Sequence, residues 1–223
     1  MKVYYHPVST TSRMIMLFAA EEGVDLEFQV VDLFTGEHLK DAYAAINPNR
    51  LVPVLEDGDF RLTESSAILK YLADKVGSPA YPKDLQKRAR VNERMDWLNS
   101  NLYRDFGYGL IYPQIFPHHN RGEQIQSGTI DWGRDKTKGW LKVLDENIIG
   151  PRSAFLCGDQ VTIADYFGGP MLSLGEVIGC NYAPYPNVTR WLGNIKKLKS
   201  WPKVNEVFYG LVNSVKDNVF QAL

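Results

Sequence analysis

The sequence of 223 residues has little cysteine and no long apolar run. Its cysteines, Cys157 and Cys180, lie far apart and form neither a CxxC pair nor the spacing of a metal site, so we interpret them as reduced structural thiols. No apolar run approaches the roughly 20 residues that span a bilayer. The N-terminus lacks the apolar region and cleavage site of a signal peptide. These absences predict a soluble protein that works in the cytoplasm.

An excess of charge of either sign is also missing. The 25 Lys and Arg residues nearly balance the 26 Asp and Glu residues, which leaves a formal net charge of −1. No overall basic field therefore attracts nucleic acid or an anionic membrane surface, and we expect neither as a partner. The sequence shows no internal repeat and no low-complexity tract, and its apolar fraction of 44% is that of an ordinary globular protein.

Strand and helix signals alternate in the first third of the chain. The β-prone runs 3–5 and 28–33 flank an apolar stretch at 14–22 that Gly23 ends as a helix-terminating glycine. This strand-helix-strand order favours parallel pairing with a right-handed crossover. A short helix, a hairpin built on Asp-Gly and a third helix are expected after it, at 39–46, 51–55 with 60–62, and 64–76. The predicted order is βαβ-α-ββα.

The remainder of the chain shows helical patterns without a convincing strand. A proline-stiffened linker at 79–85 separates an α/β domain over 1–78 from an all-helical domain over 86–223. The segment 162–165 after Gly158 resembles a capping box with Asp in place of Glu. The expected helices span 86–116 with a bend near Pro113, 123–149, a helix opened by the capping box, 188–198 and 203–219.

A hydroxyl-rich turn lies at the start of the first helix. Ser9 follows the short first strand and precedes Arg13 by four residues. Backbone N–H groups and the positive end of the helix dipole point at such a turn and favour an anion there. A thiolate held at this place would be stabilised, and a serine hydroxyl would add a charge-assisted hydrogen bond. Taken alone, the turn is explained more simply by helix capping.

Three further features of the first domain suit a peptide-like ligand. The segment Val52-Pro53 puts a proline inside a strand-like run, where a cis bond would free the Val52 backbone to pair with an added strand. The helix-opening Glu64-Ser65-Ser66 offers N–H groups for a carboxylate and an acceptor for an ammonium group. His38 and Arg50 are donors for a terminal carboxylate. Each feature alone also fits an edge-strand proline, a helix cap or a solvated surface.

The order and spacing of these features resemble the glutathione transferase family over essentially the whole chain. The resemblance is greatest to the serine-type theta class and its insect and bacterial relatives, and residues 6–9 (HPVS) are also similar to the plant phi class. The theta-like segments are 36–39 (GEHL), 47–48 (NP), 52–53 (VP), 57–60 (DGDF), 62–65 (LTES) and 82–91 (PKDLQKRARV).

This resemblance implies a thioredoxin-like first domain that binds glutathione as cosubstrate, with no metal. It implies that Ser9 activates the thiol, that Val52 pairs with the cysteinyl backbone and that Pro53 is cis. It also implies that Glu64 and Ser65 bind the γ-glutamyl end. His38 and Arg50 would then face the glycyl carboxylate, and the protein would form a homodimer.

Two positions bear on this assignment. Ser66 stands where many relatives carry Arg, which bears on the strength of the γ-glutamyl carboxylate contact. The position of Ser9 holds neither Cys nor Tyr, and a cysteine-based reductase is disfavoured because mixed-disulfide chemistry needs a sulfur nucleophile there.

The electrophile is expected between the domains, against the long helix 86–116. Aromatic side chains at helical spacing are candidates for the wall of its pocket: Tyr103, Phe106 and Tyr112. The pair His118-His119 has no third ligand at a suitable spacing, and we interpret it as a polar helix end rather than a metal site.

The leading hypothesis is a glutathione transferase that conjugates the thiolate to small electrophilic or halogenated compounds. The alternative is a non-catalytic glutathione-binding or interaction protein of the same fold. A glutathione-dependent isomerase is a third reading, disfavoured because the Ser- and Cys-rich run typical of that activity is absent. Sequence does not identify the electrophile, since fold does not fix the second substrate.

Overall fold

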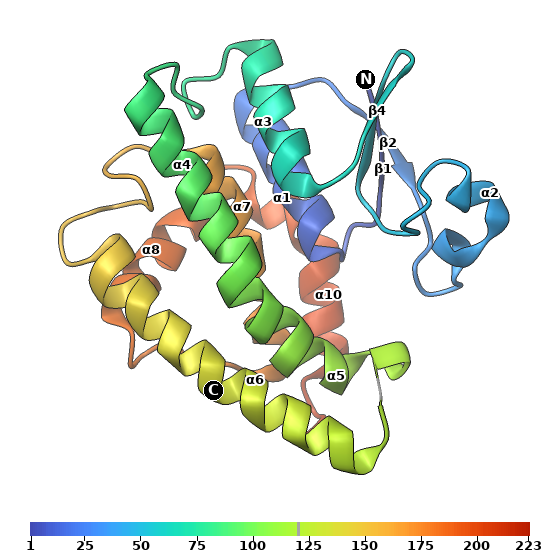
Figure 1. Ribbon diagram of the computed structural model, residues 1–223, viewed down its shortest axis with the longest axis vertical. Helices are drawn as coiled ribbons and strands as arrows, with labels where there is room; N and C mark the ends of the chain where they lie inside the picture. The colour runs from blue at the N-terminus through green and yellow to red at the C-terminus, as the bar shows by residue number, and fades with distance from the viewer. Residues whose placement is uncertain (120) are drawn as a thin grey trace.

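The computed structural model describes residues 1–119 and 121–223 (Figure 1). Its N-terminal part contains a four-stranded mixed sheet in the order β2-β1-β3-β4. The first two strands pair in parallel, with Val3 opposite Phe28, whereas β3 is antiparallel to both of its neighbours. The strands are β1 (Lys2–Tyr5), β2 (Glu27–Val30), β3 (Val54–Asp57) and β4 (Phe60–Leu62). The expected βαβ unit and Asp-Gly hairpin are both present.

Helices cover both faces of this sheet, with α1 and α3 on one side and the short α2 on the other (Figure 1). The first helix ends at Gly23, whose φ of 67° is the left-handed conformation that glycine adopts without strain. It is buried almost all round because its other side packs on helix α7 of the C-terminal part. The elements are α1 (Thr10–Glu22), η1 (Glu37–Leu39), α2 (Asp41–Ala44) and α3 (Ser65–Val76).

In its described residues the C-terminal part is built from helices joined by loops, and α6 is the longest of these helices (Figure 1). Its first long helix begins at Leu85, capped by Asp84, and continues in π-helical form before Pro113. The elements are α4 (Leu85–Trp97), η2 (Leu98–Ile111), α5 (Tyr112–Ile115), η3 (Pro117–His119), α6 (Glu123–Val143), η4 (Leu144–Ile149), α7 (Ile163–Ser173), η5 (Leu174–Ile178), α8 (Pro186–Lys196), α9 (Trp201–Val204) and α10 (Glu206–Val215). The capping box of Thr162 and Asp165 opens α7 as predicted.

Two expected elements differ from those observed. The helix expected over 203–219 is two helices, α9 and α10, because the chain turns at Asn205 and its buried side chain donates to the Trp201 carbonyl at 2.8 Å. The third strand begins at Val54 rather than Leu51, because Pro53 has no N–H to donate to the ladder. The peptide bond between Val52 and Pro53 is cis. The cis bond is the one that the resemblance implied.

A large apolar core runs through both parts of the chain, from Val3 in the sheet to Phe208 in α10. A second, smaller cluster contains Val31, Tyr43 and Val54. The segment between α3 and α4 takes part in the packing, since Ser78 donates to Glu22 at 2.6 Å and Ile163 N–H donates to the Ala80 carbonyl at 3.0 Å. Among the described helices none is both long and apolar enough to cross a membrane. Burial raises the pKa of the free thiols of Cys157 and Cys180 to about 11, so both are protonated at neutral pH.

Candidate functional site

Ser9 occupies the N-cap of α1, at the turn that leaves β1. Pro7 ends the strand, and the Ser9 N–H closes the turn by donating to the His6 carbonyl at 3.0 Å. The Ser9 hydroxyl oxygen accepts from the Ser12 N–H at 3.3 Å. The predicted capping role is therefore present. The same geometry leaves a hydroxyl beside the positive end of an almost fully buried helix.

The Ser9 hydroxyl also forms a hydrogen bond with the Thr11 hydroxyl, in which Ser9 is the donor. Their oxygens lie 3.1 Å apart, and the Thr11 hydroxyl donates to the Val52 carbonyl at 3.0 Å. Because a threonine hydroxyl carries one proton, Ser9 must be the donor to Thr11. The chain Ser9–Thr11–Val52 thus ties the first helix to the loop before β3. The sequence alone did not predict this link through Thr11.

Two side-chain hydrogen bonds to Leu51 fix the loop that carries Val52 and Pro53. The Leu51 carbonyl accepts from the Tyr43 hydroxyl and from the Asn47 side-chain amide, both at 2.8 Å. Pro53 is buried, whereas Val52 is half-buried. Within residues 1–119 and 121–223 the Val52 N–H has no hydrogen-bond partner. A donor fixed in this way is available to the backbone of an extended ligand.

Glu64, Ser65 and Ser66 form the start of α3. Glu64 has a φ of 64°, which a non-glycine residue rarely adopts, and its exposed side chain makes no cap bond. Ser65 is buried and Ser66 is half-buried at the first turn, where backbone N–H groups lack helical acceptors. The exposed Glu64 carboxylate thus lies next to the first-turn N–H groups of α3. Such a pair can accept from an ammonium group and donate to a carboxylate, the two charged groups of a zwitterionic α-amino acid.

His38 and Arg50 lie near α2, on either side of that short helix. The His38 Nδ1 atom is buried and has no partner in the described part of the chain. Burial and the neighbouring His118 lower the pKa of the His38 imidazole, so it is neutral at neutral pH. Arg50 has a φ of 57° and its guanidinium pairs with Asp41 at 3.2 Å. His38 Nδ1 therefore has no hydrogen-bond partner within residues 1–119 and 121–223, whereas Arg50 is already paired with Asp41.

Aromatic rings line the end of the long helix that comes closest to Ser9. The hydroxyls of Tyr103 and Tyr112 hydrogen-bond each other, and Tyr112 donates to the Thr10 hydroxyl at 3.4 Å. Tyr108 packs edge-on against Tyr103 and Tyr112 with ring centres 5.5 and 5.1 Å apart. Burial raises the pKa of both Tyr103 and Tyr112, so their hydroxyls keep their protons.

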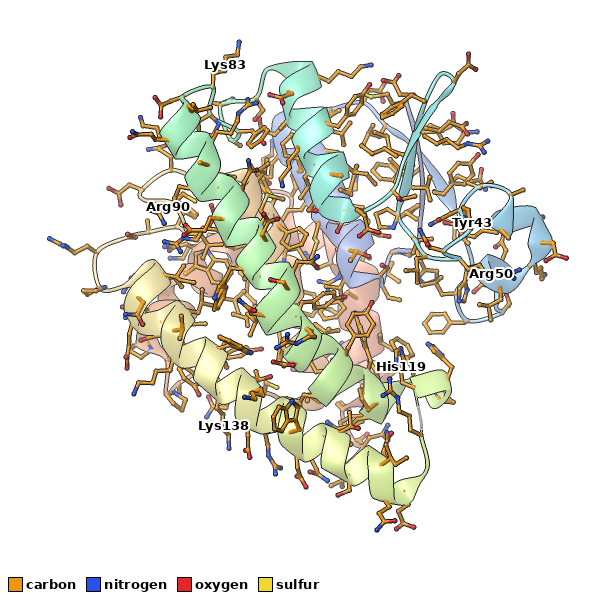
Figure 2. All side chains as sticks on the ribbon, in the orientation of Figure 1. Tyr43, Arg50, Lys83, Arg90, His119 and Lys138 are labelled. Atoms are coloured by element: carbon orange, nitrogen blue, oxygen red, sulfur yellow. The ribbon has the colours of Figure 1, made fainter. Side chains whose placement is uncertain are left out.

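The aromatic group extends past the helix end, and one predicted member does not belong to it. His119 stacks on Tyr112 with ring centres 5.6 Å apart, and Figure 2 shows His119 on the side of the helical part that lies toward Arg50. Phe106 is 0% exposed, and a Cβ placed on Gly175 would meet its ring at 2.8 Å. We therefore correct the assignment of Phe106 from pocket wall to core. Tyr108 on the same helix is 48% exposed, which makes it a further candidate for the wall.

The two sides of the candidate site act on each other electrostatically. Burial, the Tyr112 ring and the Glu64 carboxylate together raise the pKa of Tyr108 to about 12. Burial and His118 lower the pKa of His38. These pairs join the sheet-containing part to the helical part, so the predicted binding residues and the aromatic wall border one region. In the chain outside position 120, no cluster of three His, Cys, Asp or Glu residues could hold a metal.

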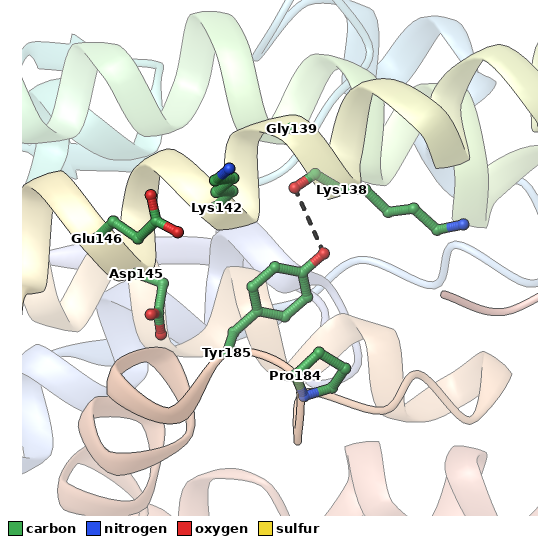
Figure 3. A pocket seen from close by; sticks show the side chains of 7 residues that line it. All are labelled: Lys138, Gly139, Lys142, Asp145, Glu146, Pro184 and Tyr185. Carbon is green, nitrogen blue, oxygen red and sulfur yellow. Dashed lines mark hydrogen bonds between the residues drawn. The ribbon is translucent and has the colours of Figure 1, made fainter.

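Two hollows lie away from this region. One, of about 400 Å³, is bordered by Lys138, Lys142, Pro184 and Tyr185, and Figure 3 shows the Tyr185 hydroxyl donating to the Lys138 carbonyl at 3.4 Å. Asp145 beneath it is committed to the backbone of α8, since it accepts from the Val188 N–H at 3.0 Å. The other, of about 440 Å³, lies behind α2 around Tyr43 and Lys40. Neither contains a predicted site residue.

The chain is similar to known proteins over most of its length. Residues 1–74 match the family "Glutathione S-transferase, N-terminal domain". Glutathione S-transferase theta-2 of Rattus norvegicus is 35% identical over 194 residues, which cover 86% of this chain and 78% of that protein. Glutathione S-transferase theta-1 of Homo sapiens is 34% identical over 86% of this chain and 80% of its own length.

Solved structures agree with these relatives. Human glutathione transferase theta-2, in complex with glutathione and an unknown ligand, superposes with a TM-score of 0.86 at 30% identity, covering 100% of this chain and 93% of that chain. A Nilaparvata lugens delta-class glutathione transferase gives a TM-score of 0.78 at 32% identity, covering 96% and 98%. The chain therefore belongs to the glutathione S-transferase family, with theta-class enzymes among its relatives, and is a glutathione transferase.

Proposed function

We propose that this enzyme conjugates glutathione to small electrophilic or halogenated compounds, with Ser9 stabilising the thiolate. The observation that carries the proposal is the position of the Ser9 hydroxyl at the N-terminus of α1, linked through Thr11 to Val52. A thiol near the Cys reference value is mostly protonated at neutral pH. Lowering its pKa by roughly two units requires about 2.7 kcal/mol of preferential thiolate stabilisation. A hydrogen bond to the anion and a helix N-terminus are contributions of that order.

The reaction needs no covalent bond to the protein. The thiolate sulfur forms a bond to an electrophilic carbon, and either a leaving group departs with the electron pair of its bond or an addition product takes up a proton. Ser9 redirects its proton from the Thr11 oxygen to the sulfur and remains a hydrogen-bond donor throughout. No step requires a metal ion.

The remaining predicted residues suit the three parts of glutathione. We propose that the free Val52 N–H pairs with the cysteinyl backbone, and that Glu64 and Ser65 at the start of α3 hold the γ-glutamyl amino and carboxylate groups. His38 faces the glycyl carboxylate, with Arg50 as a weaker partner because of its pairing with Asp41. Ser66 supplies a hydroxyl where many relatives supply a guanidinium.

The second substrate occupies the aromatic wall of the helical part. We propose that Tyr108 and Tyr112 contact it, with the buried Tyr103 fixing the Tyr112 hydroxyl. In this arrangement residues 1–78 bind glutathione, residues 86–223 supply most of the electrophile site, and 79–85 join them. We further propose that the enzyme is a cytoplasmic homodimer, which sedimentation of the purified protein tests.

Replacing Ser9 by Ala tests the proposal directly. Loss of one hydrogen bond to a thiolate, worth about 1.5–3 kcal/mol, is expected to lower kcat/KM for conjugation about ten- to a hundredfold at neutral pH. Rates are measured with an isothiocyanate and with an alkyl halide. Ser214→Ala is the matched control, because its exposed hydroxyl donates only to the Leu211 carbonyl in α10. Equal rates for wild type and Ser9→Ala would show that the Ser9 hydroxyl does not stabilise the thiolate.

A further inference from the structure

Arg13 is a charged residue that the fold buries completely, one helical turn after Ser9. Its side chain is 0% exposed, and its N–H donates to the Ser9 carbonyl at 2.9 Å. The side chain donates to Ser173 and Asn205 of the helical part, and α1 packs against this part (Figure 1). Removing a cation from water is costly unless the charge is paired. The surroundings of Arg13 therefore call for an explanation.

Every partner of the guanidinium in the described part of the chain is uncharged. One terminal nitrogen donates to the Ser173 hydroxyl at 2.9 Å and to the Asn205 side-chain oxygen at 2.7 Å. The other donates to the Pro170 carbonyl at 3.1 Å, and the guanidinium carbon lies 3.7 Å from the centre of the Phe208 ring. If Arg13 served only to hold the two domains together, a carboxylate partner would bind its guanidinium more strongly than uncharged groups do. Within residues 1–119 and 121–223 no carboxylate pairs with this charge.

The tyrosines around Arg13 do not cancel its charge. Tyr103 and Tyr112 face it from the long helix, and burial raises the pKa of both, so they remain neutral. Tyr209 faces it from α10, where its hydroxyl oxygen accepts from the Trp201 indole N–H at 3.1 Å. Burial lowers the pKa of Arg13 itself to about 10, which leaves it charged at neutral pH.

The nearby carboxylates are committed to other groups. Glu176 in η5 is the acid that acts on Arg13, and it is paired with Lys196 of α8 at 2.9 Å. Asp165 lies at the opposite end of α7, where it accepts from the Leu156 N–H at 2.8 Å and from the Trp191 indole at 2.9 Å. The positive field of Arg13 is therefore left largely uncompensated.

This field reaches the N-terminus of α1. Arg13 acts on Tyr112 to lower its pKa against the opposing effect of burial. The Tyr112 hydroxyl in turn donates to Thr10, which is next to Ser9. A unit charge about 10 Å away, at an effective dielectric constant of about 20, shifts a pKa by about one unit. The charge of Arg13 has the same sign as the helix end at Ser9, so the two effects add.

We propose that Arg13 is an electrostatic positioning residue for the transferase reaction, whose uncompensated buried charge stabilises the glutathione thiolate at Ser9. The inference rests on the proposed function, because it assumes that the thiolate lies beside Ser9. Arg13 does not touch the substrate. It acts through the protein interior, in addition to the Ser9 hydroxyl and the N-terminus of α1.

Asn205→Asp tests this inference without removing Arg13. The nearly isosteric change puts a carboxylate against the guanidinium and compensates its charge. We expect the thiol pKa of bound glutathione to rise by about one unit, so that the conjugation rate falls about tenfold at pH values below that pKa and is unchanged well above it. A merely structural role for Arg13 predicts an unaltered pH profile. Thiolate is followed by its ultraviolet absorbance, and the rate by a pH series.

Asn194→Asp is the matched control. Its amide donates to the Ala154 carbonyl at 3.1 Å, as that of Asn205 donates to the Trp201 carbonyl, so both variants lose one such bond and gain one charge. We expect the thiol pKa of this variant to stay at the wild-type value. An Asn205→Asp profile that coincides with those of the wild type and the control overturns the inference.

A second pair of variants covers the case in which Asn205→Asp does not fold. Arg13→Lys retains the charge but lacks the two guanidinium nitrogens that donate to Ser173, Asn205 and Pro170. We therefore expect lower thermal stability and a thiol pKa at the wild-type value. Arg13→Gln removes the charge and is expected to raise the thiol pKa by about one unit. Equal thiol pKa values in these two variants overturn the inference. Failure of the proposed function is distinguishable, because the wild type would then show no glutathione thiolate near neutral pH and Ser9→Ala would not change the profile.

Discussion

The Thr11 hydroxyl and the Val52 carbonyl, 41 positions apart in the chain, form a hydrogen bond of 3.0 Å that joins the turn at Ser9 to the loop before β3. The Thr11 hydroxyl oxygen also accepts a hydrogen bond from the Ser9 hydroxyl, with 3.1 Å between the two oxygens. The residue thus serves two segments of the candidate site. It fixes the loop that presents the Val52 N–H, and it orients the Ser9 hydroxyl.

Thr11→Val separates these two roles. The isosteric change removes the bond to Val52, and loss of about 1 kcal/mol of loop ordering is expected to raise KM for glutathione about fivefold. The thiol pKa is expected to stay close to the wild-type value, because Ser9 keeps its hydroxyl. Steady-state kinetics at varied glutathione concentration measures the effect. Thr189→Val, which loses a 2.8 Å bond to the Tyr182 carbonyl far from the site, should leave KM unchanged. An unchanged KM in Thr11→Val would contradict the link.

His38 should make glutathione binding depend on pH. Burial and His118 hold the pKa of the free imidazole below its ordinary value of 6.5, so His38 is neutral at pH 7. A bound carboxylate favours the protonated form, and binding should therefore tighten as the pH falls through this pKa. A charged hydrogen bond exceeds a neutral one by about 1 kcal/mol, which corresponds to about fivefold in affinity. Calorimetry with S-methylglutathione measures it without titration of the thiol.

The variant His38→Gln should abolish this pH dependence, because glutamine donates a hydrogen bond without titrating. His119→Gln is its control, since burial also lowers the pKa of His119 but its ring stacks on Tyr112. If His38→Gln keeps the full pH dependence, a group other than His38 titrates.

Tyr108 should favour aryl over alkyl electrophiles. Its ring is 48% exposed and is braced edge-on by Tyr103 and Tyr112, so an incoming ring meets a fixed aromatic face. An aromatic pair contributes about 0.5–1.5 kcal/mol beyond area burial. Tyr108→Leu should therefore lower kcat/KM for benzyl isothiocyanate up to about tenfold, with little change for hexyl isothiocyanate. Trp132→Leu, an exposed aromatic change on α6, should affect neither substrate. Equal losses for both substrates would rule out ring recognition.

Local sequence rules anticipate the parts of the site that depend on backbone geometry. The turn at Ser9, the glycine end of α1 and the capping box at Thr162 are each encoded within a few residues, and the structure contains all three. The cis bond before Pro53 follows from family resemblance rather than from spacing.

Long-range contacts are the part that sequence rules do not reach. The pairing of Arg13 with Asn205 joins positions 192 apart, and only the isolation of an arginine in an apolar helix hinted at it. Phe106 and Tyr108 are two residues apart on one helix, yet the first is in the core and the second is exposed. Helical spacing alone does not decide which face of a buried helix meets a cavity.

The contact of Gly133 on α6 with Gly109 on η2 should control the stability of the helical part. A Cβ at Gly133 would lie 2.8 Å from the Gly109 carbonyl oxygen and 2.7 Å from the Leu110 nitrogen, both backbone atoms of a packed helix. Gly133→Ala must therefore separate the helices and is expected to destabilise the protein by about 1–3 kcal/mol. Gly139→Ala on the same helix meets nothing within 4 Å and should stabilise by about 0.5–1 kcal/mol. Chemical denaturation compares the two variants. A Gly133→Ala protein as stable as Gly139→Ala would mean that the helices do not cross at these glycines.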